Sequence, residues 1–189
     1  MTRIGIIGDI GSGKSFIARQ FGYPVFNADE EVSKIYKKNI SCFNKLKKNF
    51  PKYINSFPVN KIELSKVIME KKNNINKIIK IVHPQVQLNM KKFINKNKSK
   101  KIIVLDIPLL LENKIYRKKD ILIFVQAKKS EINKRLIKRK NFNKKIYKKL
   151  KEMQLPLEIK KKKSHFIIKN NFKIKSIKKN VKNILKNIL

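Results

Sequence analysis

A glycine-rich segment close to the N-terminus constrains this chain more than any other feature. It follows a short apolar run at residues 4–7, typical of a buried strand, and precedes residues 16–21, whose pattern indicates the start of a helix. The segment consists of Gly8, Asp9, Ile10, Gly11, Ser12, Gly13, Lys14 and Ser15. A glycine, four residues and then Gly-Lys-Ser form the P-loop pattern, and a strand before it and a helix after it are its proper context. We therefore predict a binding site for a nucleoside triphosphate.

Each part of this segment has a chemical role in that prediction. The glycines allow backbone N–H groups to surround an anion, and the helix N-terminus adds the positive end of its dipole. Lys14 would bring its charge to the β- and γ-phosphates, and the Ser15 hydroxyl would be a ligand of Mg²⁺. The alternative is a glycine-rich turn that binds nothing, but the coincidence of several features in the right order favours phosphate binding.

The charge balance is the second unusual property. The 189 residues include 49 Lys and Arg against 12 Asp and Glu, a formal net charge of +37. Such an excess is typical of proteins that bind nucleic acids or anionic surfaces. However, it is almost entirely Lys, spread along the chain with abundant Asn and Ile, and AT-rich codons encode all three. We attribute it mainly to genome composition and expect only weak, salt-sensitive binding to polyanions.

The composition also limits the class of protein. No apolar run approaches the roughly 20 residues of a membrane span, and no signal peptide is visible. Cys42 is the only cysteine, so no internal disulfide can form. The length fits one domain with small insertions. We expect a cytoplasmic monomer with no membrane partner.

The rest of the pattern predicts strands alternating with helices. Apolar runs indicate five strands, at residues 4–7, 24–27, 101–106, 120–125 and 165–168. Helices are expected at 39–50, 60–71, 73–95 (interrupted at 83–84), 130–139 (capped by Ser130), 140–163 and 174–189. This order predicts an α/β fold, with a mostly parallel five-stranded sheet flanked by helices.

Several polar residues at element ends are candidates for function. Asp29 follows the second strand, where it could cap a helix or present a carboxylate at the sheet edge that binds ligands. Asp106 ends the third strand, where it could cap a loop or hold the water shell of Mg²⁺. Arg135 and Arg139 share a helix face, as phosphate ligands or as solvated charges. A lone histidine such as His83 is more often packed or exposed than functional.

Taken in order, the motifs resemble those of the dephospho-CoA kinase family among the P-loop nucleotide kinases. The family's Gly-Gly-Ile-Gly-Ser-Gly-Lys-Ser corresponds to residues 8–15, its Asp-Ala-Asp to 27–29 and its His-Pro to 83–84. Its Pro-Leu-Leu-x-Glu corresponds to residues 108–112 and its Gln-x-Pro-x-Glu-x-Lys to 154–160. The P-loop alone is common to the superfamily, whereas this combination at similar spacing is specific.

The resemblance implies a three-layer P-loop kinase fold with a definite reaction. The γ-phosphate of ATP, bound with Mg²⁺, would pass to the ribose 3′-hydroxyl of dephospho-CoA and give coenzyme A and ADP. Residues 1–37 and 99–189 would form the core, residues 38–98 a helical insertion that binds the acceptor, and residues 135–160 a lid. The partners would be ATP and dephospho-CoA, with no specific nucleic acid.

The resemblance also implies roles for single residues. Asp29 would accept the proton of the 3′-hydroxyl or orient that group, while Lys14 and Arg139 would neutralise phosphate charge. Asn170 would lie near the adenine of ATP. The ATP-binding residues would be Gly8, Asp9, Ile10, Gly11, Ser12, Gly13, Lys14, Ser15, Phe16, Arg139 and Asn170. The acceptor-binding residues would be Asp29, His83, Pro108, Leu109 and Glu112.

Departures from the family pattern keep other hypotheses open. Asp9 replaces a glycine inside the phosphate loop, where a carboxylate repels phosphate unless its side chain turns outward. Asn27 replaces the first aspartate of Asp-Ala-Asp, although Asp29 remains. One alternative is a related nucleoside or nucleotide kinase, against which the motifs at 83–84 and 108–112 argue. Another is a basic nucleic-acid-binding protein that uses ATP as a switch, for which we find no recognition motif.

Overall fold

The computed structural model describes residues 1–71, 73–139 and 142–189. The chain divides into two compact units. The first comprises residues 1–27, 96–142 and 151–189, and the second comprises residues 28–95 and 143–150. All strands of the described residues belong to the first unit, and the second is helical.

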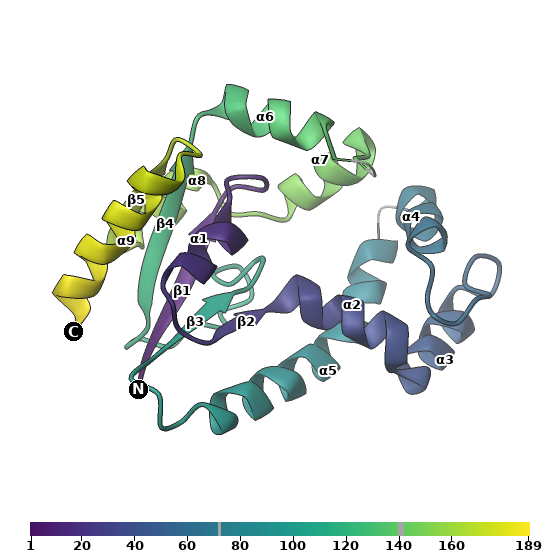
Figure 1. The fold of residues 1–189 in the computed structure, drawn as a ribbon. Helices are drawn as coiled ribbons and strands as arrows, with labels where there is room; N and C mark the ends of the chain where they lie inside the picture. The colour runs from purple at the N-terminus through teal and green to yellow at the C-terminus, as the bar shows by residue number, and fades with distance from the viewer. Residues whose placement is uncertain (72, 140–141) are drawn as a thin grey trace. The chain divides into compact units, whose positions relative to one another are not determined.

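The first unit is built around a five-stranded sheet (Figure 1). Its strands are β1 (Thr2–Gly8), β2 (Val25–Asn27), β3 (Ile102–Asp106), β4 (Ile121–Ala127) and β5 (Phe166–Asn170). They lie in the order β2-β3-β1-β4-β5, and every pair is parallel. The chain adds β2 and β3 on one side of β1 and then β4 and β5 on the other, so the strand order reverses at β1. Open α/β sheets bind ligands in the crevice at such a reversal, beyond the carboxyl ends of the strands. The predicted α/β fold with a parallel sheet is confirmed.

Helices cover the sheet because its strands are apolar on both faces. The central strands β1 and β3 are almost wholly buried, as expected of parallel strands between helices. On one face α1 (Lys14–Gln20) and α9 (Ile174–Ile188) contact each other. They contribute buried residues to the core, namely Ile17, Ala18, Ile177, Val181 and Ile184. α8 (Leu157–Lys162) contacts β1, and α6 (Lys129–Ile137) follows β4 in the chain.

The second unit contains three complete helices of the described chain and most of two more. They are α2 (Ala28–Lys38), α3 (Ile40–Asn49), α4 (Lys61–Glu70), α5 (Asn74–Lys96, whose last residue belongs to the first unit) and α7 (Lys144–Glu152, which the second unit holds as far as Leu150). Asn39 and Asn60 cap α3 and α4, because their side chains accept hydrogen bonds from Cys42 N and Ile62 N. The ends of α3, α4 and α5 each agree with the sequence prediction to within one residue. No helix of the described residues is long and apolar enough to cross a membrane.

Three local predictions were wrong. Pro84 does not interrupt the longest helix but lies inside a continuous α5, whose buried face includes Val82 and Val86. Packing of this face offsets the hydrogen bond that a proline removes. α6 begins at Lys129 with Lys128 at its N-cap, so Ser130 is not the cap. The single helical stretch expected at 140–163 is instead α7 and α8, and residues 140–141 lie outside the described residues.

Two isoleucines with very different burial should differ in how much they contribute to stability. Ile6 on β1 is 0% exposed, whereas Ile137 at the end of α6 is 70% exposed. Replacing Ile6 by Ala should lower the free energy of unfolding by about 2–5 kcal/mol, because it leaves a cavity. Ile137→Ala should change it by less than about 0.5 kcal/mol. Urea unfolding measures both, and similar losses in the two variants would contradict the burial described above.

Candidate active site

The phosphate loop joins the end of β1 to the start of α1 through a tight turn. Gly11 and Gly13 have φ angles of +83° and +92°, in the left-handed region that glycine adopts without strain. A Cβ atom on Gly13 would also lie 2.5 Å from Asn170 Nδ2, so no side chain fits there. The turn leads directly into the first turn of α1, whose N–H groups have no partner within the helix. A loop of this shape can surround a phosphate group with backbone donors.

Lys14 is the first residue of α1, and its side chain folds back over the loop. Its Nζ donates a hydrogen bond of 2.7 Å to the backbone oxygen of Asp9 and one of 3.4 Å to that of Gly8. Ser15 follows it in the first turn of the helix. Phosphate oxygens are stronger acceptors of an ammonium hydrogen bond than carbonyls. A phosphate bound in the loop could therefore replace these carbonyl oxygens as the hydrogen-bond acceptor of the Lys14 ammonium group.

Asn170 ties the loop to the end of β5. Its Nδ2 donates a hydrogen bond of 2.7 Å to Ser12 O, and its Oδ1 accepts one of 2.8 Å from Phe172 N. The guanidinium of Arg135 lies over the Phe172 ring, 4.3 Å from its centroid. The buried Asn170 side chain therefore braces the phosphate loop from behind. The sequence did not indicate this bracing role.

A pocket of about 590 Å³ lies beside Asn170. Its walls come from the ends of β4 and β5 and from the nearby turns of α6 and α9, and they include Gln126, Lys128, Glu131, Asn170, Ser176 and Asn180. These side chains offer both hydrogen-bond donors and acceptors. The pocket can therefore form hydrogen bonds with a polar group.

Asp106 and Asn27 end the neighbouring strands β3 and β2 and are paired in register. Asn27 Nδ2 donates a hydrogen bond of 2.7 Å to Asp106 Oδ2. Asp106 is buried, and a second carboxylate at position 27 would repel it. The amide at Asn27 thus removes a like charge and supplies a donor to the carboxylate. Carboxylate oxygens such as those of Asp106 are suitable ligands for Mg²⁺ or its bound water.

Glu112 forms a buried ion pair with Lys160. Its Oε1 lies 2.7 Å from Lys160 Nζ, and the two side chains are 10% and 3% exposed. The same oxygen accepts a hydrogen bond of 3.0 Å from Leu155 N. Burial by itself would raise the pKa of Glu112, but the hydrogen bond from Lys160 and those from backbone N–H groups outweigh it and lower the pKa. The pair fastens residues 108–112 to residues 154–160.

The remaining sequence candidates lie in three places. Leu109, beside Pro108, has a φ angle of +59°, which a branched side chain rarely adopts and which fixes the shape of this segment. Arg139 is exposed just after α6, in the first unit. Asp29 is exposed in the first turn of α2, two residues after β2 ends, and His83 is partly buried in α5. Asp29 and His83 belong to the second unit.

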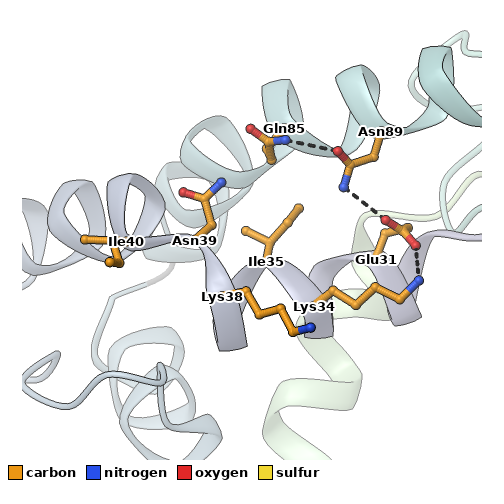
Figure 2. A pocket seen from close by; sticks show the side chains of 8 residues that line it. All are labelled: Glu31, Lys34, Ile35, Lys38, Asn39, Ile40, Gln85 and Asn89. Atoms are coloured by element: carbon orange, nitrogen blue, oxygen red, sulfur yellow. Dashed lines mark hydrogen bonds and ion pairs between the residues drawn. The ribbon is translucent and has the colours of Figure 1, made fainter.

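The second unit has a polar pocket of about 420 Å³ of its own (Figure 2). In its wall Gln85 Nε2 donates to Asn89 Oδ1 and Asn89 Nδ2 donates to Glu31, both at 3.0 Å. Lys34 donates to the other oxygen of Glu31 at 2.6 Å. Successive helical residues are rotated by about 100°, so Glu31 and Lys34 lie on the side of α2 away from Asp29. The candidate base is therefore not part of this pocket.

Comparison of the sequence with known proteins points to one family. A sequence profile of that family, described as dephospho-CoA kinase, matches residues 2–176. A curated dephospho-CoA kinase of Bartonella quintana is 34% identical, with 100% of this chain and 99% of the relative covered. One of Wolbachia pipientis wMel is also 34% identical, with 96% and 95% covered. The crystal structure of TT1252 from Thermus thermophilus has a TM-score of 0.79 at 23% identity and supports the fold, covering 100% of this chain and 98% of that one.

Replacing Asn170 by Asp should weaken the phosphate loop. The new carboxylate would face Ser12 O without a hydrogen to donate, so we expect the free energy of unfolding to fall by about 1–3 kcal/mol. Affinity for ATP should fall as well. Asn171→Asp is the matched control for stability, because Asn171 is exposed and its Oδ1 accepts a hydrogen bond from Lys173 N, which Asp can also do. Equal losses of stability in the two variants would contradict the bracing role.

The Glu112–Lys160 pair predicts a dependence of stability on pH. A lowered carboxyl pKa contributes stability above the pKa of the unfolded chain, and that contribution is lost as pH falls through the lower pKa of the folded chain. Glu112→Gln should therefore remove about 3–5 kcal/mol near neutral pH, because it leaves the Lys160 charge buried without its partner. The loss should shrink on acidification below about pH 4. Chemical unfolding across pH, with Glu158→Gln as the exposed control on α8, measures both effects.

Proposed function

The chain belongs to the dephospho-CoA kinase family, and from that premise we propose how its residues perform the family's reaction. It is an ATP-dependent kinase that transfers the γ-phosphate of ATP to the ribose 3′-hydroxyl of dephospho-CoA, giving coenzyme A and ADP. The observation that carries the assignment of residues is the phosphate loop. It combines left-handed glycines, the start of α1 and the Lys14 ammonium group at one point of the sheet.

Lys14, Arg139 and the backbone of the loop act on the ATP side of the reaction. Phosphoryl transfer requires positioning and charge neutralisation more than covalent help from the protein. The loop N–H groups and Lys14 hold the β- and γ-phosphate oxygens. Arg139, exposed after α6, adds a charge that stabilises the transition state. The adenosine part extends toward Asn170 and the pocket beside it.

Two oxygen ligands suit a magnesium ion bound with ATP. The Ser15 hydroxyl would hold it directly, and the Asp106 carboxylate would hold one of its water ligands. When bound, Mg²⁺ neutralises charge on the β- and γ-phosphates. The hydrogen bond from Asn27 keeps the Asp106 side chain in one orientation. Asn27 thus supports the metal site without being a ligand.

Asp29 acts on the acceptor side. As the 3′-oxygen forms its bond to the γ-phosphorus, the bond from that phosphorus to the β–γ bridging oxygen breaks, and ADP leaves. The hydroxyl proton passes to the Asp29 carboxylate. The helices of the second unit, with His83, hold dephospho-CoA. Pro108, Leu109 and Glu112 shape the acceptor site through the fixed form of their segment, since the Glu112 carboxylate is engaged by Lys160.

Mass detection of coenzyme A after incubation with ATP, Mg²⁺ and dephospho-CoA tests the function directly. Asp29→Asn should lower kcat by about 10²–10⁴-fold, because the hydroxyl proton loses its acceptor. The affinity for ATP should change by less than about twofold, since no phosphate ligand is removed.

Glu30→Gln is the matched control for this substitution. It removes one carboxylate from the same turn of α2 and should leave kcat nearly unchanged. Equal losses of kcat in the two variants would mean that Asp29 serves only to stabilise the helix N-terminus. A folded wild-type protein that forms no coenzyme A would contradict the proposed function itself.

A further inference from the structure

Asp9 is the only acidic residue of the phosphate loop, and it lies where bound phosphates add further negative charge. Like charges a few ångströms apart change a binding constant by powers of ten unless they are compensated. The Asp9 side chain is only 13% exposed, so it has not turned away into solvent. The loop therefore requires another means of tolerating this carboxylate.

The contacts of Asp9 show how the loop compensates the charge of this carboxylate. Its Oδ1 accepts a hydrogen bond of 2.7 Å from Ile10 N and forms an ion pair with Lys151 Nζ. Its backbone oxygen instead accepts the hydrogen bonds of Lys14 Nζ, at 2.7 Å, and Ser12 N, at 3.2 Å. The side chain and the backbone of one residue thus hold two different lysines. Lys151 is engaged by the carboxylate, and Lys14 stays on the carbonyl side of the loop.

Lys151 is suited to this role by its position and its partial burial. It belongs to the same compact unit as the phosphate loop, and its side chain is 38% exposed. An ion pair of this kind keeps the carboxylate on the Ile10 side of the loop and cancels its charge. Without Lys151, the carboxylate would repel phosphate, and it would also attract the ammonium group of Lys14.

We propose that Lys151 is a positioning residue for nucleotide binding: it neutralises Asp9 and keeps Lys14 available, so that the Asp9–Lys151 pair replaces a neutral residue in the phosphate loop. The proposal rests on the proposed function for the identity of the nucleotide. Lys151 affects nucleotide binding by neutralising Asp9, without contacting the nucleotide itself. The two residues must therefore be coupled.

A double-mutant cycle on nucleotide binding tests this coupling. Calorimetry measures the affinities of Mg·ATP, Mg·ADP and adenosine for the wild type, Lys151→Met, Asp9→Gly and the double variant. Lys151→Met should weaken ATP binding by about tenfold or more and ADP binding by less, because the repulsion grows with phosphate charge. Adenosine binding should not change. In the Asp9→Gly background, Lys151→Met should change ATP affinity by less than about threefold.

Lys148→Met is the matched control, because it removes one exposed lysine from the same helix and should leave ATP affinity within about twofold. A loss from Lys151→Met that is equally large in the Asp9→Gly background would overturn the proposal, since Lys151 would then contact the nucleotide itself. No loss in the wild-type background, or an equal loss for adenosine, would overturn it as well.

Two further measurements keep the test decisive. If Lys151→Met does not fold, Asp9→Asn replaces it: tighter ATP binding than in the wild type supports the proposal, because a negative charge has been removed, and weaker binding overturns it. Coenzyme A formation by the wild type is measured in parallel. A wild type that makes no coenzyme A but shows the coupled loss of ATP affinity would refute the proposed function and leave the role of Lys151 supported.

Discussion

The tight turn by which β1 passes into α1 is the constraint on which the rest of this site depends. The turn brings the loop so close to its neighbours that a Cβ atom on Gly8, Gly11 or Gly13 would meet another element. The atoms it would meet belong to Val125 on β4, Ile132 and Leu136 on α6, and Asn170 on β5. Three elements therefore approach the loop closely, and Asn170 Nδ2 also donates a hydrogen bond to Ser12 O within it. Parallel pairing on both sides of β1 sets the direction in which the loop leaves the sheet.

Electrostatics in this protein is governed by a scarcity of acids in a strongly basic chain. Among the ion pairs of the described residues, those of Asp9 with Lys151, Glu112 with Lys160 and Asp120 with Arg3 lie in the first unit and have at least one largely buried partner. Burial makes each of these pairs costly to break, whereas most surface lysines contribute little individually. Of the many lysines, the fold therefore brings only a few, such as Lys151 and Lys160, into contact with these acids. One of them fastens residues 108–112 to residues 154–160, and another holds the Asp9 side chain of the phosphate loop.

The sequence predicted the elements well wherever periodicity and glycine placement decide local structure. The ends of α3, α4 and α5 and the position of the P-loop depend on patterns within a few residues of each other. Predictions that failed depended on distant packing. Pro84 stays inside α5 because the buried face of that helix offsets the lost hydrogen bond, and α6 starts without a side-chain cap because Ile132 and Leu136 pack into the unit.

The sequence by itself therefore determined the parallel α/β fold, the phosphate loop and the family, since these depend on local residue order and spacing. Only the tertiary structure decided which residues act together across the chain. Asn170 braces Ser12 from 158 positions away, and Lys151 reaches Asp9 across 142 positions. In a chain with 49 basic residues, no pattern marks Lys151 out from the others. The partner of a charge is chosen by distance and burial in the folded protein, and the sequence contains neither quantity directly.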